Sequence, residues 1–511
     1  MTGQTSMATL AKSATQSPIS QLPVPLVVEL LASFEKHAIG YCYWKSSRRV
    51  RETMSGESDL DLLIAREHQH QARRILLECG FKPFPSVPAR DHPAIASFLG
   101  YDDPTGTIIH VHAHFRLVTG TKLLNEYWLP WEKILLEHAA ATAGSPIRVL
   151  DPASEAVLLV VRGCLELMRN DPVVLRNWRA MTKKFEQDRE VLATRVDRGA
   201  VRARAIELLG SGMAEDVVEA IFGPVPLDRQ RRLRRRMRRA LAERRAYNAP
   251  EAFLRSLSRG VAWVAGGVNS RVAHLPRPWS RRAAGGGCLI AVLGVDGSGK
   301  STVVRSLRSW LGAELDVMPL YFGTGEGRPS LLLWPFKLMV PLVRRLFPSK
   351  PKGASHGRIS DRPPSVFYSV LMSLWAALVA KEKRTKLRAA QRAVARGLIV
   401  VTDRYPQDEN VHYNDGPLLH RSRWSPDWLR RYEARAYEMA GQMPPDLVLK
   451  LDVEPETAAR RETDMSPVVI AERIAAVRQL AFPGARVVVV NAEQPLADVL
   501  RAVRREVWRM L

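Results

Sequence analysis

The segment Gly294–Thr302 constrains the fold of this chain more than any other feature of the sequence. It reads Gly-Val-Asp-Gly-Ser-Gly-Lys-Ser-Thr and matches the pattern Gly-x4-Gly-Lys-Ser/Thr, whose backbone can wrap around phosphate groups. The apolar run Cys288–Leu293 before it predicts a buried strand, and the residues after it, as far as Leu311, have the spacing of a helix. A strand, this loop and a helix in that order predict an α/β domain with its ligand at the carboxyl end of the strand.

The loop has the chemistry needed to bind ATP together with Mg2+. Its glycines let backbone N–H groups turn toward phosphate oxygens, and the helix N-terminus adds a partial positive charge. Lys300 would reach the β- and γ-phosphates, and the hydroxyl of Ser301 would be a ligand of Mg2+. A glycine-rich turn that binds nothing is the alternative, which the complete strand, motif and helix disfavour. The predicted cofactor-binding residues are Gly294, Asp296, Gly297, Ser298, Gly299, Lys300, Ser301 and Thr302.

Length, charge and cysteine content bound the class of protein. With 511 residues the chain is too long for one ordinary core, so two or three domains are expected. An excess of 76 basic over 52 acidic residues gives a net charge of +24, which attracts nucleotides, nucleic acid or anionic lipid. The four cysteines include no Cys-x-x-Cys pair, which argues against a disulfide framework or a cysteine zinc site and favours the cytoplasm.

Two further segments bear on targeting. Residues 1–21 are rich in Ser, Thr, Ala and Gln and lack the apolar core of a signal peptide, so we expect a disordered leader. The apolar run Val366–Ala380 is shorter than the ~20 residues that a membrane-spanning helix needs. We therefore expect a buried or interfacial helix there.

The region 22–150 predicts a small mixed α/β domain with a pair of carboxylates. Asp59 and Asp61 are separated by one residue on a predicted strand, so their side chains point to the same face. The two carboxylates could share one divalent metal ion.

Three histidines alternate on a later predicted strand, Ile108–Phe115. His110, His112 and His114 therefore share one face. They could form a metal site with the two aspartates alongside, or they could line a polar cleft and pair with the aspartates. The second interpretation is favoured, and neither is decided by the sequence.

A helical extension is expected over 151–274, beginning with a helix in Asp151–Met168 that has Pro152 near its start. Ten arginines lie in Arg229–Arg245, with apolar residues at helical spacing among them. Such a basic amphipathic helix suits an anionic membrane surface, and a solvated helix that connects two domains is the alternative. Nucleic acid is a poor candidate partner because no module of stacking aromatic residues accompanies the charge. The Pro- and Gly-rich segment 275–287 is predicted to be a linker.

The remaining region, 288–511, predicts a doubly wound α/β domain. After the first strand, the runs Leu398–Val401, Leu447–Leu451 and Val487–Val490 are apolar enough to be buried parallel strands, and helical segments separate them. Ligands of such a sheet bind at its carboxyl edge.

Three motifs of this region resemble those of the thymidylate kinase family. They are Asp296 in the glycine-rich loop, Thr-Asp-Arg-Tyr at 402–405, and Leu-Asp-Val-Glu-Pro-Glu-Thr-Ala-Ala-Arg-Arg at 451–461. The resemblance covers about 288–511 and implies the fold of a P-loop nucleoside monophosphate kinase. It also implies transfer of the γ-phosphoryl group of ATP to an acceptor phosphate such as that of dTMP.

The resemblance assigns a role to several residues. Lys300 would hold ATP, Asp403 would orient the water shell of the metal or the acceptor, and Arg404 would hold the acceptor phosphate. Asp296 would contact the sugar hydroxyl of the acceptor, and a mobile lid would supply an arginine from among Arg460, Arg461 and Arg473. The residues predicted to be catalytic are Lys300, Asp403, Arg404 and Arg461, and those predicted to bind metal are Ser301, Asp403, Asp59 and Asp61.

The sequence departs from the thymidylate kinase pattern around the acceptor. The family's Arg-Glu-Pro-Gly-Gly-Thr loop is replaced by Tyr-Phe-Gly-Thr-Gly-Glu-Gly at 321–327, and the segment 331–347 has no counterpart in a minimal enzyme of this kind. A sugar phosphate or a lipid-linked phosphate could fill the same site. Phosphoryl transfer is therefore better supported than dTMP as the acceptor.

The N-terminal region resembles the nucleotidyltransferase fold. The resemblance rests on Trp44-Lys45-Ser46-Ser47 and on the Asp-x-Asp strand, although Lys-Ser-Ser replaces the usual Gly-Ser turn and the third acidic residue is missing. The combination of the two domains resembles bacterial proteins associated with surface polysaccharide synthesis. It implies a supply of activated sugar nucleotides near the inner membrane face.

Three hypotheses follow. The first is a cytoplasmic kinase that depends on ATP and Mg2+. The second is a nucleotide-binding regulator or scaffold at the membrane, and the third is a bifunctional kinase and nucleotidyltransferase. The oligomeric state, including a homodimer, is left open by the sequence.

Overall fold

The computed structural model describes residues 22–323 and 366–511, except 143, 168–170, 225, 274, 411–416, 418, 420–424 and 464. The predicted leader and the segment 331–347 lie outside the described residues, as do positions 324–327 of the predicted acceptor loop. The chain divides into two compact units. The N-terminal unit comprises Met1–Arg271 with Trp279–Arg281, and the C-terminal unit comprises Val272–Pro278 with Arg282–Leu511.

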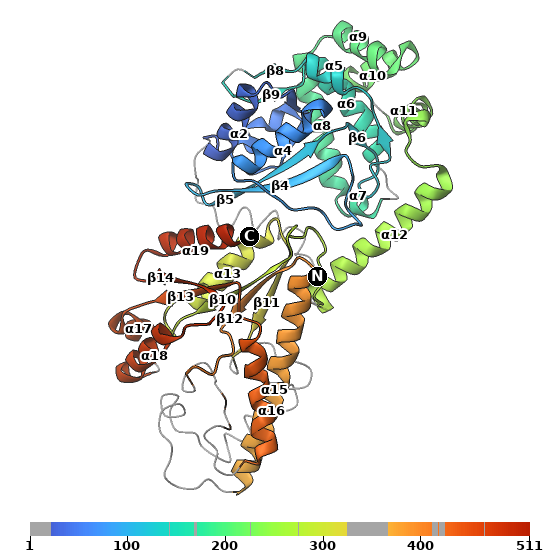
Figure 1. Cartoon of the computed structure of the whole chain (residues 1–511). Coiled ribbons are helices and arrows are strands. Elements are labelled where there is room, and N and C mark those ends of the chain that lie inside the picture. The colour runs from blue at the N-terminus through green and yellow to red at the C-terminus, as the bar shows by residue number, and fades with distance from the viewer. Residues whose placement is uncertain are drawn as a thin grey trace. The chain divides into compact units, whose positions relative to one another are not determined.

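A mixed sheet forms the centre of the N-terminal unit (Figure 1). Its strand order is β3-β4-β5-β2-β1-β9-β8. Strand β2 pairs antiparallel with β1 and parallel with β5, and β4 pairs antiparallel with β5. The strands are β1 Tyr41–Tyr43, β2 Leu60–Ile64, β3 Lys82–Pro83, β4 Ile95–Asp102, β5 Thr107–His114, β8 Ala140–Ala141 and β9 Arg148–Val149, and a separate pair comprises β6 Val118–Thr119 and β7 Tyr127–Trp128.

Helices α2 (Pro25–Lys36) and α4 (Gln69–Glu78) cover this sheet and close one core. The buried residues of α2 recur every three or four positions, so one face of the helix meets the sheet. Short helical turns complete the region: η1 Ser47–Arg49, α3 Val50–Met54, η2 Arg66–His68 and α5 Glu132–Glu137.

The helical extension packs around α6 (Pro152–Glu166) and forms a second core with Trp44. The side chain of Asp151 accepts hydrogen bonds from the N–H groups of Ala153 and Ser154, and Pro152 is the first helical residue, as predicted. The other helices are α7 Pro172–Arg176, α8 Trp178–Arg195, α9 Arg198–Leu209, α10 Ser211–Phe222, α11 Leu227–Ala240, η3 Ala242–Arg244, α12 Ala249–Val268 and the π-helical η4 Asn269–Ala273.

The predicted basic helix is α11, and its apolar face is buried within the protein. Leu233 and Met237 join the core around α6. Two arginines form ion pairs with α10, namely Arg229 with Glu219 at 3.3 Å and Arg236 with Asp216 at 2.6 Å. The apolar face of α11 is therefore not available to enter a lipid layer, although several arginines on its outer face are exposed.

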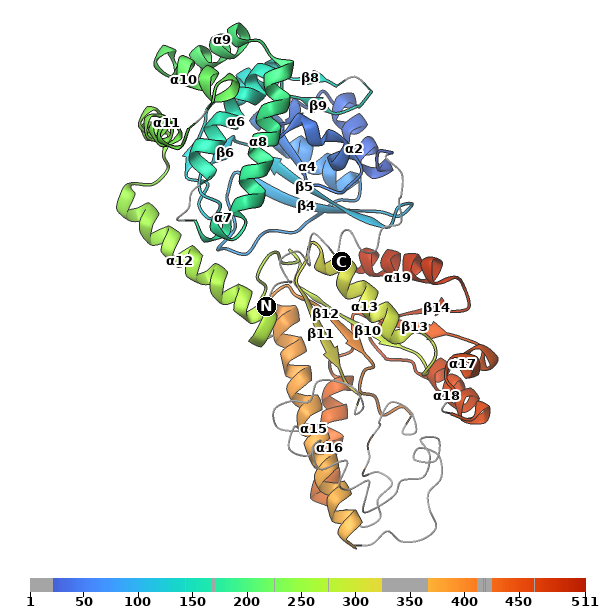
Figure 2. The ribbon, with the colours of Figure 1, turned by 180° about the vertical axis from the view of Figure 1, so that it is seen from behind.

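The C-terminal unit contains a parallel sheet with the order β11-β12-β10-β13-β14 (Figure 1). This confirms the predicted parallel α/β architecture. Figures 1 and 2 show α13 and α19 over one face of the sheet and α15 with α16 over the other. The elements are β10 Cys288–Leu293, α13 Lys300–Gly312, β11 Val317–Tyr321, α15 Val366–Ala395, β12 Ile399–Asp403, α16 Asp427–Gly441, β13 Leu447–Asp452, α17 Pro455–Arg461, α18 Pro467–Gln479, β14 Arg486–Asn491 and α19 Leu496–Met510.

The apolar run Val366–Ala380 is the first half of α15, which continues to Ala395. Among the helices of the described residues, none combines the length and the apolar character that crossing a membrane requires.

The segment 275–287, predicted to be a linker, is hydrogen-bonded along much of its length. The carbonyl of Ser280 accepts from the N–H of Val87 in the N-terminal unit. In the C-terminal unit, Ala283 N–H donates to the carbonyl of Gly397, and Gly287 N–H donates to that of Val394. These backbone bonds fix the chain directly before β10.

Candidate functional site

The glycine-rich loop follows β10 and needs glycine for steric reasons. Gly294, Gly297 and Gly299 have φ values of 156°, 84° and 91°, which L side chains rarely adopt. A Cβ atom on Gly294 would overlap the Ser298 hydroxyl, and one on Gly297 would lie 2.8 Å from the carbonyl oxygen of Ala458. The loop thus has the backbone shape of a cradle for an anion at the N-terminus of α13.

Strand β12 brings Asp403 and Arg404 beside this loop. Val292 of β10 pairs with Asp403 of β12, and Arg404 N–H donates to the carbonyl of Val292 at 3.1 Å. From β10 the chain runs to β11 on one side, whereas from β13, the parallel neighbour of β10, the chain runs to β14 on the opposite side. Adjacent parallel strands whose connections diverge form a crevice at their carboxyl ends, where ligands of such sheets bind.

Asp296 is the centre of a charged cluster in this crevice. Its Oδ1 atom lies 3.2 Å from Arg404 and 3.5 Å from the ammonium group of Lys300, and its Oδ2 atom lies 3.2 Å from Arg473. Burial raises the pKa of Asp296, but the three positive charges outweigh this effect and hold the pKa below its ordinary value. The carboxylate is therefore ionised, and it gathers three cations at the mouth of the loop.

Lys300 begins α13 and is almost fully buried, with 7% of its surface exposed. Its ammonium group donates to the carbonyl of Val295 at 2.6 Å. Burial lowers the pKa of Lys300, and the nearby Arg404 lowers it further, while Asp296 raises it. Ser301 and Thr302 follow on the first turn of α13, and both are exposed.

Asp403 and Ser298 carry polar atoms that can bind a ligand. The Oδ1 atom of Asp403 and the hydroxyl of Ser298 are buried, and neither has a hydrogen-bond partner within the described part of the chain. Burial raises the pKa of Asp403, whereas Lys300 and Arg404 lower it and only partly offset the effect. Carboxylate and hydroxyl oxygens are ligands of the type that Mg2+ prefers, so these residue types fit the predicted metal.

Arg404 has an unusual backbone conformation. Its φ of 67° lies in the left-handed region, which is uncommon for a residue other than glycine. The conformation lets the backbone N–H stay bonded to β10 while the guanidinium group reaches Asp296. Such conformations are concentrated at functional sites.

The structure separates the three candidate lid arginines. Arg473 of α18 reaches Asp296, whereas Arg460 of α17 donates to the hydroxyl of Thr457 at 3.0 Å. Arg461 is exposed at the end of α17, and its catalytic role stays a prediction.

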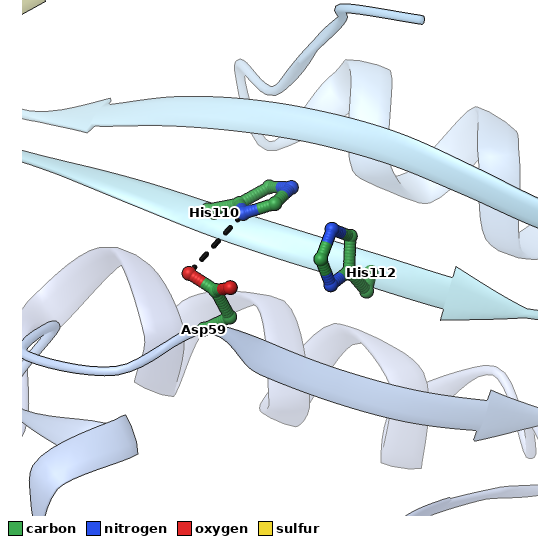
Figure 3. A group of neighbouring side chains, drawn as sticks. All are labelled: Asp59, His110 and His112. Atoms are coloured by element: carbon green, nitrogen blue, oxygen red, sulfur yellow. Dashed lines mark ion pairs between the residues drawn. The ribbon is translucent and has the colours of Figure 1, made fainter. Parts of the chain in front are cut away.

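The predicted aspartates and histidines of the N-terminal unit also meet, and Figure 3 shows Asp59, His110 and His112 of this group. The Nδ1 atom of His110 lies 3.2 Å from Oδ1 of Asp59. Oδ1 of Asp61 lies 3.2 Å from Nδ1 of His112 and 3.6 Å from Nε2 of His114. Asp59 stands just before β2, so only Asp61 of the pair belongs to the strand itself.

Burial sets the protonation of this group. It lowers the pKa of His110 to about 3 and that of His114 to about 4, so both imidazoles are neutral near pH 7. Burial raises the pKa of Asp61, but the positive charge of Lys45 and hydrogen bonds from the histidines hold it well below its ordinary range. Burial also lowers the pKa of Lys45, to about 8.

Sequence reasoning missed two neighbours of these histidines. The hydroxyl of Ser97 on β4 lies 2.7 Å from Nε2 of His110, and the guanidinium group of Arg281 lies 3.2 Å from Nδ1 of the same ring. Both come from distant parts of the chain, so no local pattern could have indicated them.

No protein-family model matches this chain, but its sequence is similar to those of two Escherichia coli proteins. The sequence is 30% identical to the uncharacterized ATP-binding protein YghS of strain K12 over 230 residues, which is 44% of this chain and 93% of YghS. It is 28% identical to the uncharacterized ATP-binding protein YghR of the same strain over 225 residues, 43% of this chain and 86% of YghR. Because the first match covers nearly all of the relative, this chain belongs to the same protein family as YghS.

Proposed function

We propose that the C-terminal unit binds ATP with Mg2+ and transfers the γ-phosphoryl group to a phosphorylated small molecule, such as a nucleoside monophosphate resembling dTMP. The observation that carries this proposal is the meeting of the glycine-rich loop with Asp403 and Arg404 at the carboxyl ends of adjacent parallel strands. The relatives YghS and YghR are named ATP-binding proteins, which supports nucleotide binding by this chain.

Phosphoryl transfer needs positioning and charge neutralisation more than covalent chemistry. The loop amides and Lys300 would hold the nucleotide phosphates, and Ser301 and Asp403 would hold Mg2+ directly or through its water. Mg2+ would neutralise charge on the phosphates. Arg404 would bind the acceptor phosphate, and Arg461 would approach the transferring group from the lid.

Asp296 keeps Arg404 and Arg473 in place before any ligand binds. Its carboxylate forms ion pairs with both guanidinium groups, as well as with the ammonium group of Lys300. A phosphate that enters the crevice offers stronger charge to the same cations, so the ion pairs with Asp296 can be exchanged for contacts with phosphate. That exchange frees Asp296 to accept a hydrogen bond from a sugar hydroxyl.

The test is a phosphoryl-transfer screen with the full-length protein, ATP and Mg2+. The acceptors are dTMP, other nucleoside monophosphates and sugar phosphates. Lys300→Ala should lower transfer by about 10²-fold or more, because a charge that stabilises the transition state is removed. Lys381→Ala, on the exposed surface of α15, is the matched control and should keep full activity.

ATP binding is measured on the same variants. Tight binding of ATP with no turnover of any acceptor would exclude the kinase proposal and leave a nucleotide-binding regulator or scaffold. Unchanged transfer in Lys300→Ala would reject the glycine-rich loop as the site.

A second candidate function, association with an anionic membrane surface, is favoured by α12. Five of its apolar side chains recur every three or four residues and are each more than half exposed. The opposite face is packed, because Trp279 lies against Gly266 so closely that a Cβ atom would overlap its ring. The stripe consists of Leu254, Leu257, Val261, Val264 and Val268.

The arginines of α11 directly precede this stripe in the chain, so an apolar face adjoins a strongly basic segment. That combination suits an anionic lipid surface, such as the inner face of a bacterial membrane. We expect the full-length protein to sediment with phosphatidylglycerol vesicles and not with phosphatidylcholine vesicles. The triple variant Leu257→Gln, Val261→Gln and Val264→Gln should lose most binding, whereas Leu77→Gln, at an exposed position of α4, should keep it. Equal binding to both lipids would contradict the proposal.

A further inference from the structure

One carboxylate and two imidazoles form a compact cluster in the N-terminal unit (Figure 3). Asp59 immediately precedes β2, and His110 and His112 both lie on β5. Each residue offers one ligand atom, and these atoms lie within 4.8 Å of one another. Donor atoms at such separations can share a single cation.

The sheet itself brings the three residues together. Strands β2 and β5 are parallel neighbours, and Asp61 pairs with His112. Continued two residues back, to the residue that directly precedes β2, the same register sets Asp59 beside His110. Because side chains alternate along a strand, all four point to one face of the sheet. The arrangement is therefore fixed by backbone pairing rather than by a loop.

Both imidazoles are oriented by a second hydrogen-bonding group. Ser97 contacts Nε2 of His110 at 2.7 Å, which leaves Nδ1 facing Asp59. Asp61 contacts Nδ1 of His112 at 3.2 Å, which leaves Nε2 for a ligand. Metal-binding histidines in proteins have such outer partners, which fix the ring orientation.

The cluster is closed on one side and open on the other. The side chain of His110 is 1% exposed, whereas that of Asp59 is 40% exposed. A cation could enter past Asp59, and it would keep an open coordination position there for water or a substrate.

Arg281 occupies the approach to His110. Its guanidinium group lies 3.2 Å from Nδ1 of His110, the same nitrogen that faces Asp59. The backbone beside Arg281 is fixed by two contacts. The carbonyl of Ser280 accepts a hydrogen bond from Val87 N–H, and Arg281 itself forms an antiparallel β-bridge with Ser86. A cation and this guanidinium group would compete for the same nitrogen.

We propose that Asp59, Nδ1 of His110 and Nε2 of His112 bind a divalent transition metal ion of the Zn2+ class, and that binding displaces the guanidinium group of Arg281. Two imidazole nitrogens and one carboxylate suit Zn2+, Co2+ or Mn2+, whereas Mg2+ prefers oxygen ligands only. In this site Asp61 orients His112 instead of sharing the ion with Asp59. The inference goes beyond the proposed function, because the site lies in the other unit and does not require ATP.

The test uses full-length protein stripped of metal with a chelator and then titrated with Co2+ and Zn2+ in excess Mg2+. We expect Co2+ to bind with the strong visible bands of a site of low coordination number and without thiolate charge-transfer bands. Asp59→Asn and His112→Gln should each weaken binding at least about 10-fold. His138→Gln, which changes an exposed histidine, is the control and should bind as the wild type does.

Arg281→Met provides an independent measurement. Removing the competing cation should raise the affinity for Co2+ several-fold, which a purely structural role of Arg281 would not predict. Circular dichroism of each variant without metal shows that the fold is kept. The proposal is overturned if Co2+ gives no such spectrum, if neither Asp59→Asn nor His112→Gln weakens binding, or if Mg2+ competes on equal terms.

Discussion

Lys45 shows how strongly the surroundings of the aspartates and histidines in the N-terminal unit change the pKa of a single side chain. Its ammonium group lies 4.0 Å from the centre of the Trp44 ring, and burial lowers its pKa to about 8 although Asp61 raises it. Lys-Ser-Ser stands at 45–47 where the nucleotidyltransferase resemblance implies Gly-Ser. The substitution therefore adds a titratable amine close to Asp61.

We predict a lysine that titrates near pH 8 in the folded protein. NMR of reductively 13C-methylated protein should show this signal, and Lys45→Arg should remove it. Because the folded pKa lies below 10.5, the value of an exposed lysine, the unfolded chain binds more protons between about pH 8 and 10.5. The contribution of Lys45 to stability should therefore become more favourable as the pH rises through that range. Titration of every lysine near its ordinary pKa would refute the prediction.

At the scale of elements, the connection into β10 determines how precisely the glycine-rich loop is placed. A run of glycines, 285–287, ends at this strand. Gly287 lies so close to the backbone of Leu398 that a Cβ atom would overlap the Leu398 carbonyl. Around Gly285, two residues earlier, no atom of the described residues lies within 4 Å of the position that a Cβ atom would take.

Gly287→Ala should destabilise the C-terminal unit by about 2 kcal/mol or more, because backbone atoms cannot move aside cheaply. Gly285→Ala makes the same chemical change in open space and should alter stability by less than about 0.5 kcal/mol. Urea unfolding followed by intrinsic fluorescence compares the two variants. Equal stability of the two would mean that the chain enters β10 by another route.

At the scale of the whole molecule, the chain divides into two compact units, each with its own sheet. The N-terminal unit carries the cluster of aspartates and histidines, and the C-terminal unit carries the glycine-rich loop. The chain crosses between the units at 271–272, 278–279 and 281–282, and residues on both sides of the last crossing are hydrogen-bonded to their own unit. Each proposed site is therefore built entirely from residues of one unit.

We predict two separable thermal transitions in the full-length protein. ATP with Mg2+, at 100 times its Kd, should stabilise the unit that binds it by about 2.7 kcal/mol. The midpoint temperature of only one of the two transitions should therefore rise. Differential scanning calorimetry with and without nucleotide makes the comparison, and Lys300→Ala should show no such rise. A single transition that moves as a whole would show that the two units unfold together.

Local patterns in the sequence determined the elements and part of each site. The apolar run before Gly294 and the glycine spacing after it were sufficient to predict β10, the loop and α13, because strand burial and phosphate binding both leave a local signature. The alternation of Asp59 with Asp61, and of His110 with His112 and His114, likewise predicted which side chains share a face.

Only the tertiary structure decided which of these faces meet and what surrounds them. It selected Arg473, rather than Arg460, as the partner of Asp296, because the fold of α18 and not sequence spacing sets that distance. It also buried the apolar face of α11, which the sequence left available to a membrane. It brought Ser97 and Arg281 to the two nitrogens of His110 from positions 13 and 171 residues away. Contacts between distant segments depend on strand register and helix packing across the whole unit, and local periodicity in the sequence does not predict them.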